Sequence, residues 1–339
     1  MSSPLPSAAN PEFAGAQVLV TGAGGFIGSH LCESLVRAGA NVRALIRYSS
    51  HGSIGNLAFL PPDILSQIEI VAGNIEDSES LQRMFENCTA VFHLAALIGI
   101  PYSYHAPRSY LRSNIEGTFN VLEAARRAQI QRLVITSTSE VYGSAQRVPI
   151  DETHPLQGQS PYSASKIAAE KLTESYVCSF GLPAVTVRPF NTYGPRQSAR
   201  AIIPSIISQA LHSPEIRLGN LTTTRDLTFV TDTCDGLLRA GLVPDIDGLI
   251  CNLGVGKRIA IGDLAKLILE RMNLEKPIVL SSDRLRPEGS EVLDLESDNR
   301  LARERLAWTP QISLSDGIDR VISFLRTQPA LADASRYAV

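Results

Sequence analysis

A tyrosine and a lysine four residues apart are the side chains in this sequence best suited to proton transfer. Tyr162 and Lys166 lie in "SPYSASKIAAEKL" (160–172), within a stretch whose pattern predicts a helix over 161–179. Residues at i and i+4 share one face of a helix, so we expect the phenol and the ammonium to be neighbours. An ammonium lowers the pKa of a nearby phenol, which ordinarily titrates near ~10. The pair therefore predicts a tyrosine that acts as a base near neutral pH.

A second cluster of polar side chains follows a short apolar run. The segment "TSTSEVYG" (136–143) comes after residues 132–135, which read as a buried strand, and it places Thr138, Ser139 and Glu140 at the end of that strand. Ligands in open α/β sheets bind outside the carboxyl ends of the strands, so this segment is a candidate for the reacting centre. A solvated carboxylate at a strand end is the alternative interpretation of Glu140.

The elements that would position these residues alternate regularly along the chain. Buried strands are predicted at 17–20, 42–46, 68–71, 90–94, 133–136 and 184–187, with helices at 26–38, 78–87, 108–128 and 161–179. This alternation predicts an α/β fold of the Rossmann type, a doubly wound parallel sheet with right-handed crossovers.

The character of the sequence changes after residue 190, where segments become shorter and only helices near 261–272 and 313–326 stand out. We expect a flexible tail over 1–14, a dinucleotide-binding domain over 15–190, and a smaller substrate-binding lobe over 191–339 that is interleaved with it.

A glycine-rich turn joins the first predicted strand to the first helix. In "VLVTGAGGFIGSHL" (18–31), Gly22 allows a tight turn, Gly25 lets the backbone approach a pyrophosphate, and Gly28 lets the helix lie close to the sheet. Phe26 and Ile27 open the helix, whose N-terminal amides attract phosphate. Because the required strand and helix flank the glycines, the sequence predicts a bound NAD or NADP.

The ends of the other strands supply the rest of the predicted cofactor site. The second strand ends in "RALIRYSS" with Arg47 and no acid, which favours NADP, although an arginine that stacks on adenine or points to solvent is the alternative. The remaining residues assigned to this site are Asn74, Ile75, Leu94, Ala95, Ala96 and Pro189, together with Tyr162 and Lys166.

Composition excludes several other classes of protein. The 339 residues carry a net charge of −3 without long basic runs, which argues against binding to nucleic acid. The six histidines show no metal-ligand spacing, and no apolar run approaches the ~18 residues of a membrane span. Five cysteines without a C-x-x-C pair and an N-terminal stretch without signal-peptide features predict a cytoplasmic protein.

Taken together, the glycine turn, the hydroxyl-rich strand end and Y-x-x-x-K resemble the extended short-chain dehydrogenase/reductase family, over about residues 16–326. Within that family, "LAALIGIPYSYHAP", "TSTSEVYG", "RPFNTYGPRQSARAIIPSII" and "RLRPEGSEV" are most similar to nucleotide-sugar 4,6-dehydratases, especially those that act on UDP-N-acetylglucosamine. The resemblance implies a tightly bound cofactor that is recycled in each turnover.

The resemblance also implies a division of labour among the catalytic residues. Tyr162, with Thr138, would remove the proton from O4 of the hexose while C4 is oxidised. Glu140 would then abstract the hydrogen at C5, so that the C6 hydroxyl leaves as water. Dehydratases of dTDP-glucose carry an aspartate before this glutamate, whereas Ser139 stands here, as in GDP-mannose dehydratases. The proton donor to the leaving hydroxyl would then be Glu140 itself or a water.

Three other activities remain open at this point. A UDP-glucuronate decarboxylase also reads "TSEVYG", and a 4-epimerase shares the fold, although an epimerase has no need of Glu140. A dinucleotide-binding sensor without catalysis is the alternative from another class, and the intact set of Thr138, Tyr162 and Lys166 argues against it.

The resemblance further suggests how the substrate and a second subunit bind. Asn191 and Arg225 match family residues that contact the sugar diphosphate, Arg286 would be a second clamp on it, and Ser103 would contact the sugar. The helices predicted at 108–128 and 161–179 are those that form an intersubunit four-helix bundle in similar enzymes, so we expect a homodimer.

Overall fold

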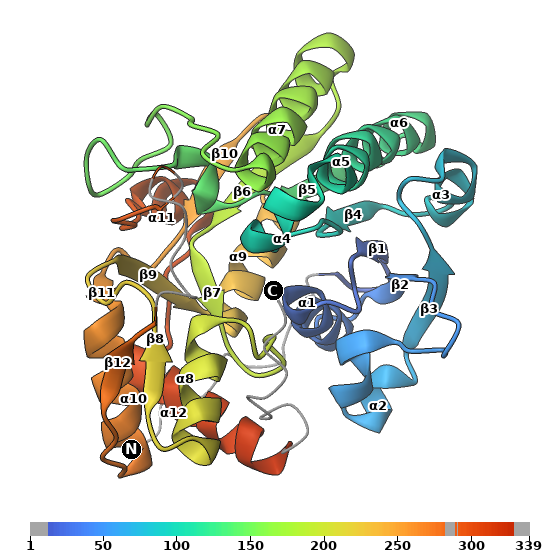
Figure 1. Cartoon of the computed structure of the whole chain (residues 1–339). Helices are drawn as coiled ribbons and strands as arrows, with labels where there is room; N and C mark the ends of the chain where they lie inside the picture. The colour runs from blue at the N-terminus through green and yellow to red at the C-terminus, as the bar shows by residue number, and fades with distance from the viewer. Residues whose placement is uncertain (1–12, 282–288, 290, 329–339) are drawn as a thin grey trace.

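A seven-stranded parallel sheet lies at the centre of the computed structural model, which describes residues 13–281, 289 and 291–328 (Figure 1). The strand order is β10-β6-β5-β4-β1-β2-β3. The strands are β1 (Gln17–Thr21), β2 (Asn41–Arg47), β3 (Ile68–Gly73), β4 (Ala90–His93), β5 (Arg132–Thr136), β6 (Ala184–Pro189) and β10 (Ile250–Leu253). The predicted doubly wound parallel sheet is thus confirmed.

Helices cover both faces of this sheet because the strand residues alternate between two apolar cores. On one face, Val18 and Val20 pack with α1 (Phe26–Arg37) and α9 (Val230–Leu242). On the other face, Leu19 packs with α3 (Ser78–Met84), α6 (Gly117–Ala128) and α7 (Pro161–Phe180). In Figure 1, α6 and α7 lie side by side on this second face.

The helix predicted at 108–128 is interrupted by a wider turn. It consists of α5 (Pro107–Tyr110), a π-helical turn (Leu111–Glu116) and α6. Asn114, in the π turn, accepts a hydrogen bond from the backbone N–H of Leu97 at 2.8 Å and donates to the Leu97 carbonyl at 2.9 Å. These bonds fasten the turn to the loop after β4. Single π turns of this kind are frequent at functional sites.

Short elements complete the sheet domain. They are two 3₁₀ turns (Gly55–Phe59 and Ser139–Tyr142), α2 (Pro62–Leu65) and α4 (Ile100–His105).

The smaller lobe holds two further sheets. One contains β11 (Arg258–Ala260), β9 (Thr224–Phe229) and β7 (Asn191–Tyr193), and the other pairs β12 (Ile278–Leu280) with β8 (Ile216–Leu218). Its helices are α8 (Ile202–His212), α10 (Ile261–Met272) and α12 (Leu314–Thr327), while α11 (Arg300–Leu306) packs beside β10 and α9.

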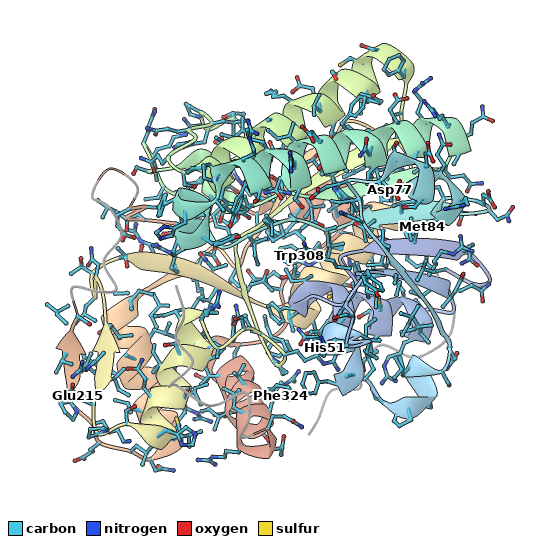
Figure 2. All side chains as sticks on the ribbon, turned by 45° about the vertical axis from the view of Figure 1, so that its right-hand side comes forward. His51, Asp77, Met84, Glu215, Trp308 and Phe324 are labelled. Carbon is cyan, nitrogen blue, oxygen red and sulfur yellow. The ribbon has the colours of Figure 1, made fainter. Side chains whose placement is uncertain are left out.

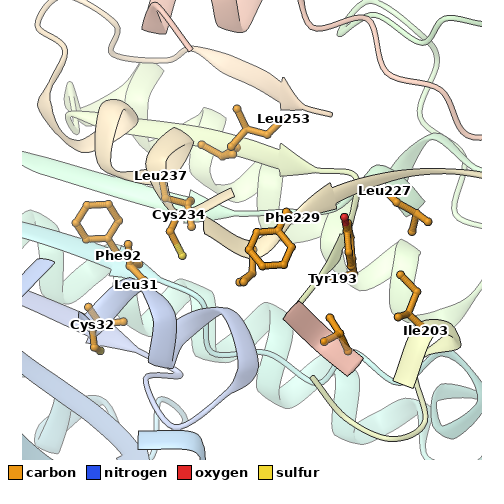
Figure 3. Packing of buried hydrophobic residues seen from close by; sticks show 14 of the residues in the cluster. Leu31, Cys32, Phe92, Tyr193, Ile203, Leu227, Phe229, Cys234, Leu237 and Leu253 are labelled. Carbon is orange, nitrogen blue, oxygen red and sulfur yellow. The ribbon is translucent and has the colours of Figure 1, made fainter. Parts of the chain in front are cut away.

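The two parts of the chain share one hydrophobic core. Figure 3 shows it running from Leu31 of α1 through Leu237 of α9 to Phe229 and Tyr193 of the lobe. Trp308, labelled in Figure 2, is fully buried and donates a hydrogen bond to the Asp232 carbonyl of α9 at 2.9 Å. Both α9 and β10 follow residue 190 in sequence yet belong to the layers of the central sheet.

Residues 1–12 of the predicted tail lie outside the described residues. Phe13 is buried, and its ring packs edge-on against Phe92 of β4 with the centroids 6.1 Å apart. The packed part of the chain therefore includes residue 13, which the sequence had suggested was still tail. In the described part of the chain, no helix is long and apolar enough to cross a membrane.

Candidate active site

A cleft of about 1070 Å³ opens where the parallel strands end. Its walls come from the segments after β1 to β6, from the first turns of α1 and α7, and from the start of the lobe at Asn191. All of the residues predicted to bind the cofactor line this cleft, and so do Thr138, Ser139 and Glu140. Segments far apart in the sequence thus meet around one cavity.

Two glycines, Gly22 in the turn after β1 and Gly28 in the first turn of α1, have no room for a side chain. Gly22 has φ +71°, and a Cβ on it would lie 2.7 Å from the backbone nitrogen of Ala95. A Cβ on Gly28 would lie 2.3 Å from the Gly22 carbonyl oxygen, so this glycine sets the distance between α1 and the turn. Gly25 caps α1, which has no acidic residue in its first turn, so the positive end of the helix faces the cleft uncompensated by a carboxylate.

This cradle fits a dinucleotide. Among the described residues, apart from its neighbours in the chain, a Cβ on Gly25 would meet the Gly22 oxygen at 3.1 Å and no other atom within 4 Å, so its other sides are open to a ligand. Farther along the cleft, Arg47 is exposed at the end of β2, while Ile75 is buried after β3 and packs on Gly117. Helix amides beside an open glycine suit a pyrophosphate, and the apolar surface of Ile75 suits a flat base.

The end of β5 turns sharply, so that three polar side chains face the cleft. Thr138 caps the 3₁₀ turn Ser139–Tyr142, and its hydroxyl oxygen accepts a hydrogen bond from the Glu140 backbone N–H at 3.2 Å. Ser139 is buried, whereas Glu140 and Thr138 are half-buried. Because the cap occupies an acceptor position on Thr138, its hydroxyl proton remains available to a neighbour.

Tyr162 is that neighbour. A capping box made by Ser160 and Ser163 starts α7, so that Tyr162 lies in its first turn. Burial raises the pKa of Tyr162, the Thr138 hydroxyl bonded to the phenol lowers it, and the negative charge of Glu140 raises it. The prediction of a lowered phenol pKa is therefore wrong for the protein without ligands, because loss of water outweighs the favourable contacts.

Lys166 lies one turn after Tyr162 and reaches into the floor of the cleft. Its ammonium donates to the Thr136 carbonyl at 2.8 Å. Burial lowers the pKa of Lys166 to about 8, while the charge of Glu170 acts in the opposite direction. The side chain is therefore close to losing its proton at the alkaline end of the neutral range.

A buried histidine that the sequence reasoning did not single out lies beneath this floor without lining the cleft. His93 ends β4, and its ring nitrogens lie 2.8 Å from the Thr21 hydroxyl and 3.0 Å from the Thr118 hydroxyl. Burial, reinforced by the charge of Lys166, lowers the pKa of His93 to about 3, so it is neutral. The sequence feature that could have identified His93 is its place at the end of a core strand, where it opens "HLAAL" (93–97).

On the lobe side, Asn191 lines the cleft with a buried side-chain oxygen that has no hydrogen-bond partner among the described residues. Gln197, which the sequence reasoning missed, also lines the cleft and has a buried oxygen of the same kind. Its amide donates to the Thr192 carbonyl at 2.9 Å, which turns the oxygen away from that strand. Two amide oxygens are thus available as acceptors for a ligand's donors.

The other predicted substrate contacts lie elsewhere. Ser103 is fully buried and donates to the Ile100 carbonyl at 2.6 Å, because it sits on the inner face of α4; its neighbour Tyr102 lines the cleft instead. Arg225 is buried outside the cleft lining, 3.5 Å from Glu291, and Arg286 lies outside the described residues. Residues 225 and 226 alternate along β9, so Asp226 points away from Arg225 and accepts backbone amides of Val255 and Gly256.

Comparison with known proteins identifies the family. A sequence model described as GDP-mannose 4,6 dehydratase matches residues 19–321. The chain belongs to that family of extended short-chain dehydrogenases/reductases. A UDP-glucose 4-epimerase of Mycolicibacterium smegmatis is 33% identical, over 92% of this chain and 99% of that protein. The family therefore includes relatives of different activity at similar distance.

Solved structures of the same family superpose along nearly the whole chain. A dTDP-glucose 4,6-dehydratase from Streptomyces venezuelae, solved with NAD, has a TM-score of 0.83 at 28% identity, covering 93% of this chain and 98% of that one. A UDP-N-acetylglucosamine 4-epimerase from Methanobrevibacter ruminantium has a TM-score of 0.85 at 25% identity, covering 93% and 100%. The chain is thus a member of a family of nucleotide-sugar dehydratases and epimerases.

No cluster of three or more histidine, cysteine, aspartate or glutamate side chains that could hold a metal ion occurs among the residues described.

Proposed function

We propose that the protein is a nucleotide-sugar 4,6-dehydratase that converts UDP-N-acetylglucosamine into a 4-keto-6-deoxy sugar. The observation that carries this proposal is the placement of Glu140 and Tyr162 on one cleft, close enough for the charge of Glu140 to act on the phenol, with Thr138 bonded to that phenol. A single proton acceptor suffices to oxidise C4. A second base beside it suits the removal of another proton, at C5, which distinguishes a dehydratase from a 4-epimerase more sharply than from a decarboxylase.

NAD or NADP is the cofactor that the cleft would hold, with the pyrophosphate on the glycine turn and the adenine beside Ile75. When bound, the nicotinamide supplies the acceptor, and later the donor, of one hydride. Arg47, exposed at the end of β2, supports NADP because a guanidinium suits a 2′-phosphate. The NAD bound by the Streptomyces dehydratase supports NAD instead.

Tyr162 and Thr138 act first in this scheme. The phenolate of Tyr162 takes the proton from the C4 hydroxyl, and Thr138 donates a hydrogen bond that stabilises the negative charge on either oxygen. Lys166, as a cation in the floor of the cleft, favours the phenolate over the phenol. The 4-keto group that results makes the hydrogen on C5 acidic.

Glu140 then acts on the second half of the reaction. Its carboxylate abstracts the C5 hydrogen, and the C6 hydroxyl leaves as water after it receives a proton from Glu140 or from a water molecule beside Ser139. The 4-keto-5,6-ene that this leaves would take up the returning hydride at C6 and a proton from solvent at C5, which gives the 4-keto-6-deoxy sugar. Half-burial of Glu140 suits this role, since a partly desolvated carboxylate remains in contact with the cleft.

Substrate binding is assigned to the lobe side of the cleft. The unpartnered oxygen of Asn191 is an acceptor for a sugar hydroxyl or amide, and Arg225 would contact the diphosphate after it leaves Glu291. Arg286, which lies outside the described residues, is the second diphosphate contact that the resemblance implies. The N-acetylated hexose rests on the sequence resemblance and on the similarity to the Methanobrevibacter enzyme.

The decisive experiment incubates the purified protein with UDP-, GDP-, dTDP- and CDP-sugars in deuterated water and follows the products by mass spectrometry. A dehydratase gives loss of water with gain of one deuterium, a decarboxylase gives loss of carbon dioxide, and an epimerase leaves the mass unchanged. Unchanged mass with a changed sugar configuration would overturn the proposal.

A 4-epimerase is the second candidate, because the Mycolicibacterium relative at 33% identity carries that name. Glu140→Gln separates the two functions. We expect this variant to lose dehydration about 1000-fold, as befits removal of a catalytic base, while oxidation at C4 continues. Measured separately by mass spectrometry and by absorbance of the reduced nicotinamide, dehydration at the wild-type rate would remove Glu140 from the mechanism.

We further propose that the protein is a homodimer whose subunits pair α6 and α7 in a four-helix bundle. Phe119 on α6 and Phe180 on α7 are 44% and 56% exposed, and α6 and α7 lie side by side, so both rings are available to a second copy. The cytoplasmic location expected from the sequence stays a prediction.

A further inference from the structure

A buried ion pair lies behind the catalytic segment, residues 137–142, which contains Thr138 and Glu140. The pair itself does not line the cleft. Glu170 on α7 and Arg188 on β6 have side chains only 2% and 3% exposed. Two hydrogen bonds join them, from Arg188 Nε to Glu170 Oε1 at 3.0 Å and from Arg188 Nη2 to Glu170 Oε2 at 2.6 Å. This fork fixes the orientation of both side chains, because each uses two atoms.

Each partner of the pair also holds one end of the catalytic segment. The Ser137 hydroxyl donates to Glu170 Oε1. Arg188 Nη1 donates to the Tyr142 hydroxyl at 2.8 Å, and the guanidinium lies over the Tyr142 ring, 4.9 Å from its centroid. Ser137 directly precedes Thr138, and Tyr142 is the last residue of the 3₁₀ turn that contains Glu140.

The bonds extend beyond the pair to two other elements. The Tyr142 hydroxyl donates to Asn252 Oδ1 of β10 at 2.6 Å, and Asn252 Nδ2 donates to the Ile150 carbonyl at 3.0 Å. Burial disfavours the charged form of Arg188, but its bonds to Glu170 outweigh this and raise the pKa of Arg188. The guanidinium therefore stays charged and keeps all of its contacts.

We propose that the Glu170–Arg188 pair is the positioning element of the active site, which holds Thr138 and Glu140 at a fixed distance from Tyr162. Glu170 and Tyr162 belong to the same helix, so the pair links the two sides of the reacting centre through rigid elements. The kinetic part of this inference rests on the proposed function. The structural part, that the pair orders residues 138–143, does not.

Stability alone is a weak explanation for such a pair. Burying two charges costs free energy that their attraction barely returns, and apolar residues of similar size often serve a fold as well. An ion pair that is hydrogen-bonded to both ends of the catalytic segment, however, limits how that segment can move. Small displacements of reacting groups matter greatly, since about 1 Å can cost roughly 100-fold in rate.

The test removes each anchor while leaving the ion pair in place. Amide hydrogen exchange of residues 138–143 should rise about tenfold in Ser137→Ala, which loses one hydrogen bond, and at least about tenfold in Tyr142→Phe, which loses the bonds to Arg188 and Asn252. With the preferred nucleotide sugar, kcat should fall about 100-fold while KM and the affinity for the dinucleotide change less than about twofold. Circular dichroism and thermal unfolding verify that each variant is folded.

Two matched controls remove buried hydroxyls that are not connected to the pair. Thr173→Val deletes the bond from the Thr173 hydroxyl to the Ala169 carbonyl on the same helix. Tyr193→Phe deletes the bond from a buried phenol to the Leu314 carbonyl. Both should leave exchange in 138–143 and kcat unchanged, even if stability falls.

A third variant shows whether Ser137 acts through Glu170. Glu170→Gln keeps an acceptor oxygen but removes the charge, and the double variant Ser137→Ala/Glu170→Gln should lose no more kcat than the worse single variant. Additive losses, or unchanged exchange in 138–143 in both anchor variants, would overturn the positioning role. Increased exchange in a protein that turns over no nucleotide sugar would support the positioning role and refute the proposed function.

Discussion

Burial and the Glu170 carboxylate shift the pKa of Lys166 in opposite directions. Burial lowers its pKa to about 8, and Glu170 favours the ammonium. The cation is therefore present below about pH 8 and is lost as the pH rises through that value. In the proposed mechanism the cation favours the phenolate of Tyr162, so turnover of the nucleotide sugar should decline above this pH.

The charge of Glu170 should be visible in the titration of Lys166. In ligand-free Glu170→Gln protein, the pKa of Lys166 should fall below the wild-type value, because burial then acts unopposed. NMR of protein with isotope-labelled lysine measures this directly. Lys171 on the same helix pairs with Glu174 at the surface and is the internal control, since its NMR signal should be the same in both proteins. An unchanged or raised pKa of Lys166 would contradict the electrostatic link.

Loss of the phenol should abolish the first chemical step. Tyr162→Phe keeps the ring but removes the base, so cofactor reduction by the substrate should slow about 1000-fold. Dinucleotide affinity, measured by calorimetry, should change far less than the rate. Reduction at the wild-type rate would show that another group accepts the O4 proton.

For single residues, the sequence predicted which side chains can take part in chemistry better than it predicted the direction in which they point. Tyr162 and Lys166 are neighbours because helical spacing dictates it, and this needed no tertiary information. Ser103 was assigned to the sugar, yet its hydroxyl is turned into the protein by the Ile100 carbonyl. The pKa of Tyr162 also depends on burial, which depends on residues from several distant segments.

Among the elements, the turn between β1 and α1 is tightly constrained by close contacts with backbone atoms. Gly28→Ala would place a methyl group 2.3 Å from the Gly22 carbonyl oxygen, so α1 must move away from the turn. We expect dinucleotide affinity to fall at least about 100-fold, because the phosphate site depends on the helix amides.

Gly262→Ala is the matched control for that substitution. Gly262 lies in the first turn of α10, and a Cβ there would meet nothing closer than the Leu221 carbonyl oxygen at 3.4 Å. This variant should bind the dinucleotide normally and be stabilised by up to about 1 kcal/mol, measured by urea unfolding. Equal losses of affinity in both variants would refute the geometric argument.

Local pattern identified six strands of the central sheet and the helices α1, α3, α6, α7, α10 and α12, but it missed β10, α8 and α9. "ICNL" (250–253) is only four residues long and contains Asn252, so no periodicity sets it apart. Its place beside β6 is decided by tertiary contacts, including the bond from Tyr142 to Asn252. The π turn (Leu111–Glu116) was not predicted for the same reason, because Asn114 is hydrogen-bonded to Leu97 in a loop distant in sequence.

For the whole molecule, the exposed aromatic side chains of α6 and α7 predict the state of assembly. Phe119→Glu should convert the dimer to a monomer, because a buried charge without a partner opposes association. Light scattering coupled to size exclusion measures the mass. Leu280→Glu, at a residue 71% exposed on the distant β12, should leave the mass unchanged. A wild-type protein that is already monomeric would refute the proposed bundle.

The return of the chain to the central sheet through α9 and β10 limits how this enzyme can be recombined with its relatives. A fragment cut near residue 190 would leave β6 as an open edge and remove α9 from the core around Leu31 and Phe92. Exchanging whole C-terminal segments between family members would therefore disrupt the central sheet domain as well as change the substrate specificity. Transplanting substrate preference should instead be confined to surface loops such as 194–201, which touch the ligand cavity but carry no strand of the sheet.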